Sequence, residues 1–105
     1  MEMSANYLTG QPALVAASIA RSIAAFERNY KHVKIGITGR PTQRAAEHAS
    51  DGWKRLVLKY RTSSARNANA IEKYFIERRP ELKNKWTGYS YLTETGPYYV
   101  YLIMK

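Results

Sequence analysis

The spacing of apolar residues predicts a helix near the start of the chain. After Pro12, apolar side chains recur every three or four positions, at Val15, Ile19, Ile23 and Phe26. This period is that of an amphipathic helix with a narrow apolar face, and we expect an extra packing helix over 12–29. Residues 1–10 show no comparable period, so we expect a flexible start.

The remaining pattern alternates between strand and helix periods. It predicts strands over 33–38 and 53–62, helices from Pro41 or Thr42 to Ser50 and from Ser63 or Ser64 to Arg79, and a hairpin formed by 89–93 and 98–104. In this order the elements predict an α+β fold with a small antiparallel sheet of about three strands flanked by helices. At 105 residues, we expect a single domain over 1–105.

Charge and composition narrow the function. The chain has 17 Lys and Arg against 8 Asp and Glu, a net charge of +9, which favours an anionic partner such as nucleic acid. The absence of cysteine excludes disulfides and thiolate zinc sites, and two histidines are too few for a His-rich site. A metal would therefore be Mg²⁺ or Mn²⁺, held by carboxylate oxygens and water.

No apolar run is long enough to span a membrane, and no signal-peptide pattern opens the sequence, so we expect a cytoplasmic protein. We also expect a monomer or homodimer.

One carboxylate stands apart from the other acidic residues. Glu72 has apolar residues three and four positions away on its predicted helix. A carboxylate beside an apolar face is costly unless a metal or an arginine compensates it. The alternative is an edge glutamate that turns to solvent or pairs with Arg66 or Lys73.

Arg44 and His48 are four residues apart and therefore share one helix face. A guanidinium can clamp a phosphoryl oxygen, and an imidazole can assist a nucleophile or a leaving group. A solvated helix face is the alternative interpretation. Tyrosine is abundant, at nine residues, and most of it suits half-buried strands.

The stretch "KIGITGRPTQRAAEH" resembles the second strand and first helix of the GIY-YIG endonuclease family. The matching residues are Lys34, Ile35, Gly36, Thr38, Arg44 and His48, and Glu72 and Asn84 stand at the positions of the family's metal-binding Glu and following Asn. The resemblance covers about 33–86. Lys34 replaces the usual tyrosine, as it does in some restriction-type and phage-type members.

The family's first motif strand is missing upstream, where a helix is predicted instead. The C-terminal "YYVYLIMK" resembles that strand, with Tyr101 as the functional tyrosine and Tyr99 at the position of the family's glycine. The chain therefore resembles a circularly permuted member, with 98–104 lying antiparallel beside 33–38.

The resemblance implies a metal-dependent endonuclease that hydrolyses phosphodiester bonds in double-stranded DNA. Glu72 would hold one Mg²⁺ (or Mn²⁺), and Arg44 would offset charge in the transition state. Tyr101, assisted by Lys34 or His48, would take a proton from the attacking water. Asn84 would support the site or the substrate.

Two other functions are compatible with the same residues. A module of the same fold could bind nucleic acid without cutting it, through the predicted phosphate contacts of Arg40, Arg44, Lys54, Arg55 and Lys59. A small phage or mobile-element factor could instead bind a protein through the tyrosine-rich hairpin.

Overall fold

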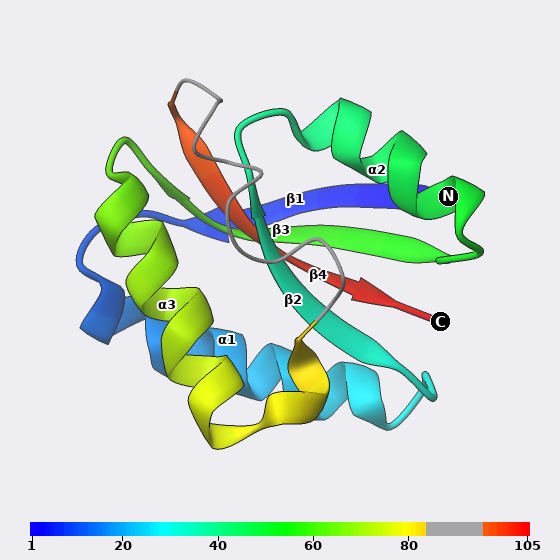
Figure 1. Ribbon diagram of the computed structural model, residues 1–105. Helices are drawn as coiled ribbons and strands as arrows, with labels where there is room; N and C mark the ends of the chain where they lie inside the picture. The colour runs from blue at the N-terminus through cyan, green and yellow to red at the C-terminus, as the bar shows by residue number, and fades with distance from the viewer. Residues whose placement is uncertain (84–95) are drawn as a thin grey trace.

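The computed structural model describes residues 1–83 and 96–105 (Figure 1). Its elements, in chain order, are β1 (Glu2–Leu8), α1 (Pro12–Glu27), β2 (Val33–Thr38), α2 (Pro41–Ser50), β3 (Arg55–Thr62), α3 (Ala65–Arg78), the 3₁₀ turn η1 (Pro80–Leu82) and β4 (Tyr98–Met104). The predicted α+β class is confirmed. The first arm of the predicted hairpin, 89–93, lies outside the described residues.

The strands form one mixed sheet in the order β1-β3-β4-β2. β4 pairs antiparallel with both β2 and β3, whereas β1 runs parallel to β3. The expectation that Tyr98–Met104 lies antiparallel beside Val33–Thr38 is confirmed: Gly36 lies opposite Tyr101.

Two expectations about the sheet were wrong: it has four strands rather than about three, and it is not purely antiparallel. The additional strand is β1, where we expected a flexible start over 1–10. The residues of β1 alternate between polar and apolar from Glu2 to Tyr7, which is the period of a strand, but all seven are exposed or half-buried, so neither face of β1 is part of the core. Backbone pairing with β3 holds it, including the bond from the Glu2 amide to the Lys54 carbonyl oxygen at 3.0 Å.

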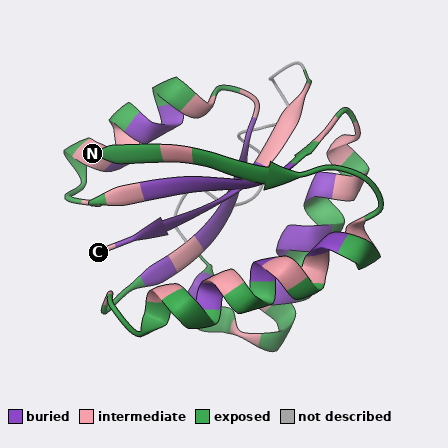
Figure 2. Cartoon of the chain, turned by 180° about the vertical axis from the view of Figure 1, so that it is seen from behind, coloured by how far each residue is buried: buried purple, intermediate pink, exposed green. Residues whose placement is uncertain are grey.

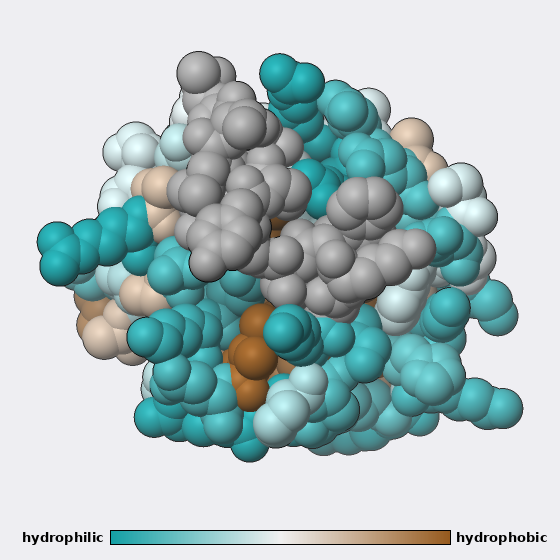
Figure 3. Space-filling view, in the orientation of Figure 1, coloured by the Kyte–Doolittle hydropathy of each residue, from teal (hydrophilic) through white to brown (hydrophobic). Residues whose placement is uncertain are grey.

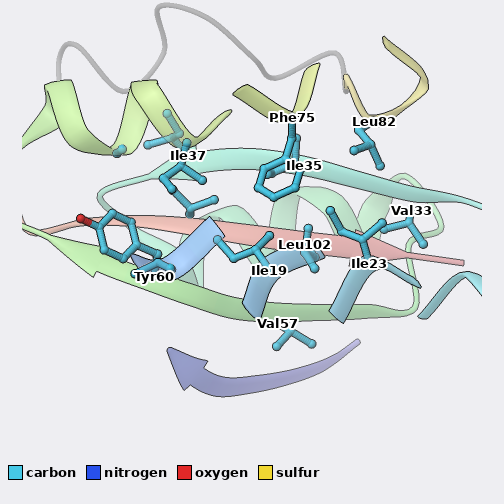
Figure 4. Close-up of a cluster of buried hydrophobic side chains, with 14 of the residues drawn as sticks. Ile19, Ile23, Val33, Ile35, Ile37, Val57, Tyr60, Phe75, Leu82 and Leu102 are labelled. Atoms are coloured by element: carbon cyan, nitrogen blue, oxygen red, sulfur yellow. The ribbon is translucent and has the colours of Figure 1, made fainter. Parts of the chain in front are cut away.

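The helices cover the two faces of the sheet unequally (Figure 1). α1 and α3 pack on one face, over the main core, where Ile19, Ile35, Phe75 and Leu102 are buried (Figure 4). α2 covers the other face, where a smaller apolar cluster holds Ala45, Leu56, Leu58, Tyr101 and Ile103. Each strand sends alternate side chains to these two faces.

Local signals place the helix ends as the sequence predicts. Pro41 opens α2, and Gly52, with a positive φ of 86°, completes the turn that follows it. The Ser64 hydroxyl caps α3 by accepting from the Asn67 amide at 3.1 Å, and Pro80 follows its end. Along the chain, α2 therefore connects β2 to β3 through short turns.

The segment after α3 is fastened to the outer edge of β2. Arg79 donates to Glu81 at 2.7 Å and to Glu27 of α1 at 2.9 Å, and the bond to Glu27 holds the pKa of that carboxyl below its ordinary value. Lys83 then forms a β-bridge with Ile35. Within the described parts of the chain, no helix is long and apolar enough to cross a membrane.

The buried stripe of α1 should account for the docking of this helix. We expect Ile19→Ala to lower the free energy of unfolding by about 2–4 kcal/mol, because the side chain is fully buried and its loss leaves a cavity. Leu14→Ala, on the same helix but at a side chain that is 78% exposed, should change it by less than about 0.5 kcal/mol. Urea denaturation followed by circular dichroism measures both, and equal losses would contradict the observed orientation of α1.

Candidate active site

The C-terminal strand and the motif helix meet at one buried hydrogen bond. His48 Nε2 and the Tyr101 hydroxyl lie 2.8 Å apart, although the two residues are 53 positions apart in the chain. Both side chains are fully buried, and their ring centroids are separated by 5.5 Å. A phenol bonded to a neutral imidazole can pass its proton to that imidazole. This pair is therefore the centre of the candidate site.

Arg44 lies one turn before His48 on the face of α2 that packs against the sheet. It is buried together with Ala45 and His48, the two other buried residues of this helix. A guanidinium is seldom buried in a small protein unless it has a role in the fold or in binding an anion. The predicted shared face of Arg44 and His48 is confirmed, and it points inward rather than into solvent.

Trp53 is a part of the site that the sequence analysis missed. Its ring stands edge-on to the His48 ring, with centroids 6.4 Å apart, and the Lys105 ammonium lies 4.5 Å from the Trp53 ring centre. Trp53 therefore packs against His48 in addition to Tyr101. The available signal was its position in the turn after α2, five residues beyond His48, which we interpreted only as the start of a strand.

Lys34 is bonded to the segment that follows α3. Its ammonium donates to the carbonyl oxygen of Glu81, in the segment that covers the outer edge of β2. Of the two predicted helpers of Tyr101, the structure therefore brings His48 into contact and directs Lys34 to the sheet edge.

Glu72 is a buried carboxylate on α3, only 5% exposed. Its Oε2 atom has no hydrogen-bond partner among the described residues. Burial raises the pKa of this carboxyl to about 7, against a smaller opposing effect of Lys83. The alternative interpretation of Glu72, an edge glutamate that turns to solvent or pairs with Arg66 or Lys73, does not hold: the side chain is buried, and Lys73 is near Glu77 instead, at 3.8 Å.

Glu72 and Tyr101 approach β2 from different layers. Tyr101 belongs to the apolar cluster beneath α2, while the buried neighbours of Glu72 on α3, Ile71 and Phe75, belong to the cluster on the other face. Lys83, whose charge acts on Glu72, is bridged to Ile35 of β2. A ligand that reached both groups would have to pass the outer edge of β2.

The donor set fits one hydrated magnesium ion better than a protein-enclosed metal site. Among the residues that the structure describes, no group of three or more His, Cys, Asp or Glu could hold a metal. Mg²⁺ commonly keeps several waters and binds proteins through one or two carboxylates. The unpaired Oε2 of Glu72 suits that mode of binding.

The predicted phosphate-binding residues differ in their surroundings. Arg40 and Lys54, near the two ends of α2, are exposed. Arg55 is engaged elsewhere, 3.4 Å from Glu2 and over the ring of Phe26 of α1. Lys59 is buried, which lowers the pKa of its ammonium. Asn84 lies outside the described residues.

An apolar cavity of about 370 Å³ lies elsewhere, between α1 and α3. It is lined by Pro12, Ala13, Ala16, Ala70, Ile71 and Tyr74. This lining offers one phenol and no carboxylate, imidazole or amine, so it is poorly suited to acid–base chemistry.

Comparisons with protein-family models, with curated proteins and with solved structures find no match to this chain. Functional assignment therefore depends on the residues and their geometry.

Ionisation of Glu72 should make the fold less stable as the pH rises. The carboxyl has a pKa of about 7 in the folded state, against 4.5 ordinarily, so the folded state binds more protons between these values. The stabilisation that the protonated carboxyl gives relative to the ionised one is fully present below pH 4.5 and is lost as the pH rises through about 7, which lowers the free energy of unfolding by roughly 3 kcal/mol.

Glu72→Gln cannot ionise, so in EDTA we expect it to be more stable than the parent at pH 8 and close to it at pH 4.5. Urea midpoints at several pH values measure the effect. Glu77→Gln, at an exposed position on the same helix, is the control and should follow the parent. Identical pH profiles for the parent and Glu72→Gln would contradict the burial of this carboxylate.

Proposed function

We propose that this chain is a metal-dependent endonuclease of the GIY-YIG type, in a circularly permuted form, that hydrolyses phosphodiester bonds in DNA. The observation that carries the proposal is the hydrogen bond between Tyr101 and His48, with Arg44 one turn away. The resemblance predicted that a C-terminal tyrosine would meet the motif helix, and nothing in the local sequence requires that contact.

The strand arrangement supports the permutation. β4, which resembles the family's first strand, pairs with β2, which resembles the second, over the whole length Val33–Thr38. Glu2 lies beside Arg55, and Arg55 lies beside Met104, so the first and last strands are separated only by β3. A change in chain order needs little rearrangement when the ends lie this close together.

The residues of this chain would divide the reaction as follows. Arg44 binds a non-bridging phosphate oxygen and offsets the charge that develops as water adds to phosphorus. Tyr101 gives its proton to His48 Nε2, and its phenolate then takes a proton from the attacking water. The bond from phosphorus to the leaving sugar oxygen breaks as the new bond forms.

Glu72 would hold the metal through its unpaired Oε2. When bound, Mg²⁺ supplies Lewis-acid stabilisation of the phosphate and of the leaving oxygen. The positive charge of the chain, +9, would attract the polyanionic substrate, and the face seen in Figure 3 is mainly hydrophilic.

A nucleic-acid-binding module without nuclease activity is the second candidate. The packing of α3, which carries Glu72, and of Tyr101 on different faces of the sheet favours it, because a binder needs no shared metal site. Plasmid nicking with Mg²⁺ and with EDTA distinguishes the two functions.

Removing the charge of Glu72 should affect DNA cleavage without weakening DNA binding. We expect Glu72→Gln to abolish Mg²⁺-dependent nicking while DNA affinity stays the same or rises, because the charge that holds the metal and repels phosphate is lost. Glu77→Gln, at an exposed position on the same helix, should nick as the parent does. If Glu72→Gln nicks DNA as fast as the parent, the metal does not bind at Glu72, and the resemblance to the family would apply to the fold and not to the proposed mechanism.

Loss of the phenol should affect chemistry more than binding. We expect Tyr101→Phe to lower the nicking rate about 100-fold at unchanged DNA affinity, because the ring still fills its buried place while the proton acceptor is lost. Arg44→Ala should lose both nicking and affinity, since Arg44 would contact phosphate before and during the reaction. Single-turnover kinetics and fluorescence anisotropy measure the two effects, and a Tyr101→Phe variant as active as the parent would exclude Tyr101 as the base.

Phosphate contacts should make binding strongly dependent on salt. We expect the logarithm of the association constant for duplex DNA to fall with the logarithm of salt concentration with a slope of about −3 to −6, reflecting several displaced counterions. Titrations between 50 and 300 mM NaCl measure the slope. An unchanged affinity over this range would argue against both nucleic-acid functions.

A further inference from the structure

The two edges of the sheet are treated differently by this fold. Beyond β2, Lys83 bridges to Ile35, and Lys34 donates to the Glu81 carbonyl oxygen, so that edge is covered. Beyond β1, no strand or bridge is present in the described parts of the chain. Exposed edges are usually protected by lysine, proline, β-bulges or short length. β1 has seven residues and contains no lysine, arginine or proline, and its pairing with β3 is regular from Glu2 to Ala5, with one irregularity between Ala5 and Leu8.

The open edge also carries exposed apolar side chains. Six large hydrophobic residues are exposed among those that the structure describes, and four of them lie within the first eight positions: Met1, Met3, Tyr7 and Leu8, each between 38% and 44% exposed. Figure 2 shows β1 as a largely exposed strand beside the buried strands of the sheet. Such a concentration on one edge indicates an interaction surface.

The backbone direction of β1 shows which groups are available for pairing. The Glu2 amide points inward to the Lys54 carbonyl oxygen, so by alternation the amides of Met3 and Ala5 point outward. Met3 registers with Leu56 and Ala5 with Leu58, which places both side chains on the face that α2 covers. The Tyr7 ring contacts Tyr99 on that same face, with centroids 5.7 Å apart.

We propose that β1 pairs antiparallel with β1 of a second copy of this chain, with the two-fold axis at Ala5. In this register the outward-pointing backbone groups of Ala5 bond to those of the partner's Ala5. Met3 lies opposite the partner's Tyr7 on one face, and Ser4 lies opposite the partner's Asn6 on the other. The irregularity that β1 shows between Ala5 and Leu8 in its pairing with β3 falls in the outer parts of this ladder, away from the axis.

The charges of β1 permit a second copy at this edge. β1 carries a single charge, that of Glu2, which lies opposite the partner's Leu8 in the proposed register and is already near Arg55, at 3.4 Å. Two chains of charge +9 can therefore meet here without placing like charges opposite each other. The axis is perpendicular to the sheet, so both α2 faces lie on the same side of one eight-stranded sheet.

Sedimentation equilibrium on the full chain tests the dimer without any nucleic acid or activity. Because the interface is one strand pair wide, we expect a dissociation constant on the order of 10 μM, measured between about 1 and 500 μM. Ala5→Lys places two like charges directly across the axis and should weaken the dimer at least about tenfold. Leu14→Lys adds the same charge at an exposed apolar position on α1 and should leave the dimer unchanged.

A mixing experiment tests the register itself. Ala5→Glu alone should also weaken the dimer. An equimolar mixture of Ala5→Glu and Ala5→Lys should associate at least as tightly as the parent, because opposite charges then face each other across the axis. Circular dichroism verifies that each variant is folded. Any one of three results would overturn the proposal. The parent could stay monomeric at 500 μM, Ala5→Lys could leave the dimer as tight as in the parent, or the mixture of the two variants could fail to associate as tightly as the parent.

Discussion

The rest of the structure depends on the pairing of β4 with β2 on one side and with β3 on the other. These two ladders place the last residues of the described chain at the centre of the sheet, where Leu102 faces the core beneath α1 and α3 and Tyr101 faces α2. Tyr101 can meet His48 only because β4 is held in that register. The same strand therefore completes the core and supplies the central group of the candidate site.

Glu72 shows how stability and the proposed function oppose each other. An apolar side chain at this position of α3 would avoid the cost of burying a carboxylate, which the raised pKa of about 7 reflects. Groups that are costly for the fold tend to occur at functional sites, where binding of a ligand offsets the cost. A single bound magnesium ion would lower that cost by favouring the charged form of Glu72.

Sequence reasoning reached the elements whose signals are local. The helices that begin at Pro41 and after Ser64 were predicted because prolines and a capping hydroxyl act on neighbouring residues. β1 was missed although its polar and apolar residues alternate, because the segment is short, its side chains remain largely exposed and backbone bonds to β3 hold it. The family resemblance predicted the placement of β4 beside β2, which apolar periodicity does not specify.

For the candidate site, the sequence specified that Arg44 and His48 share a helix face and that Glu72 borders an apolar one, because residues three and four apart on a helix are neighbours. Only the tertiary structure decided that Tyr101 bonds to His48, that Lys34 turns to the sheet edge, and that Glu72 lies in the other layer. Those contacts join segments far apart in the chain. They depend on strand order, register and the packing of whole layers, which no short stretch of sequence encodes.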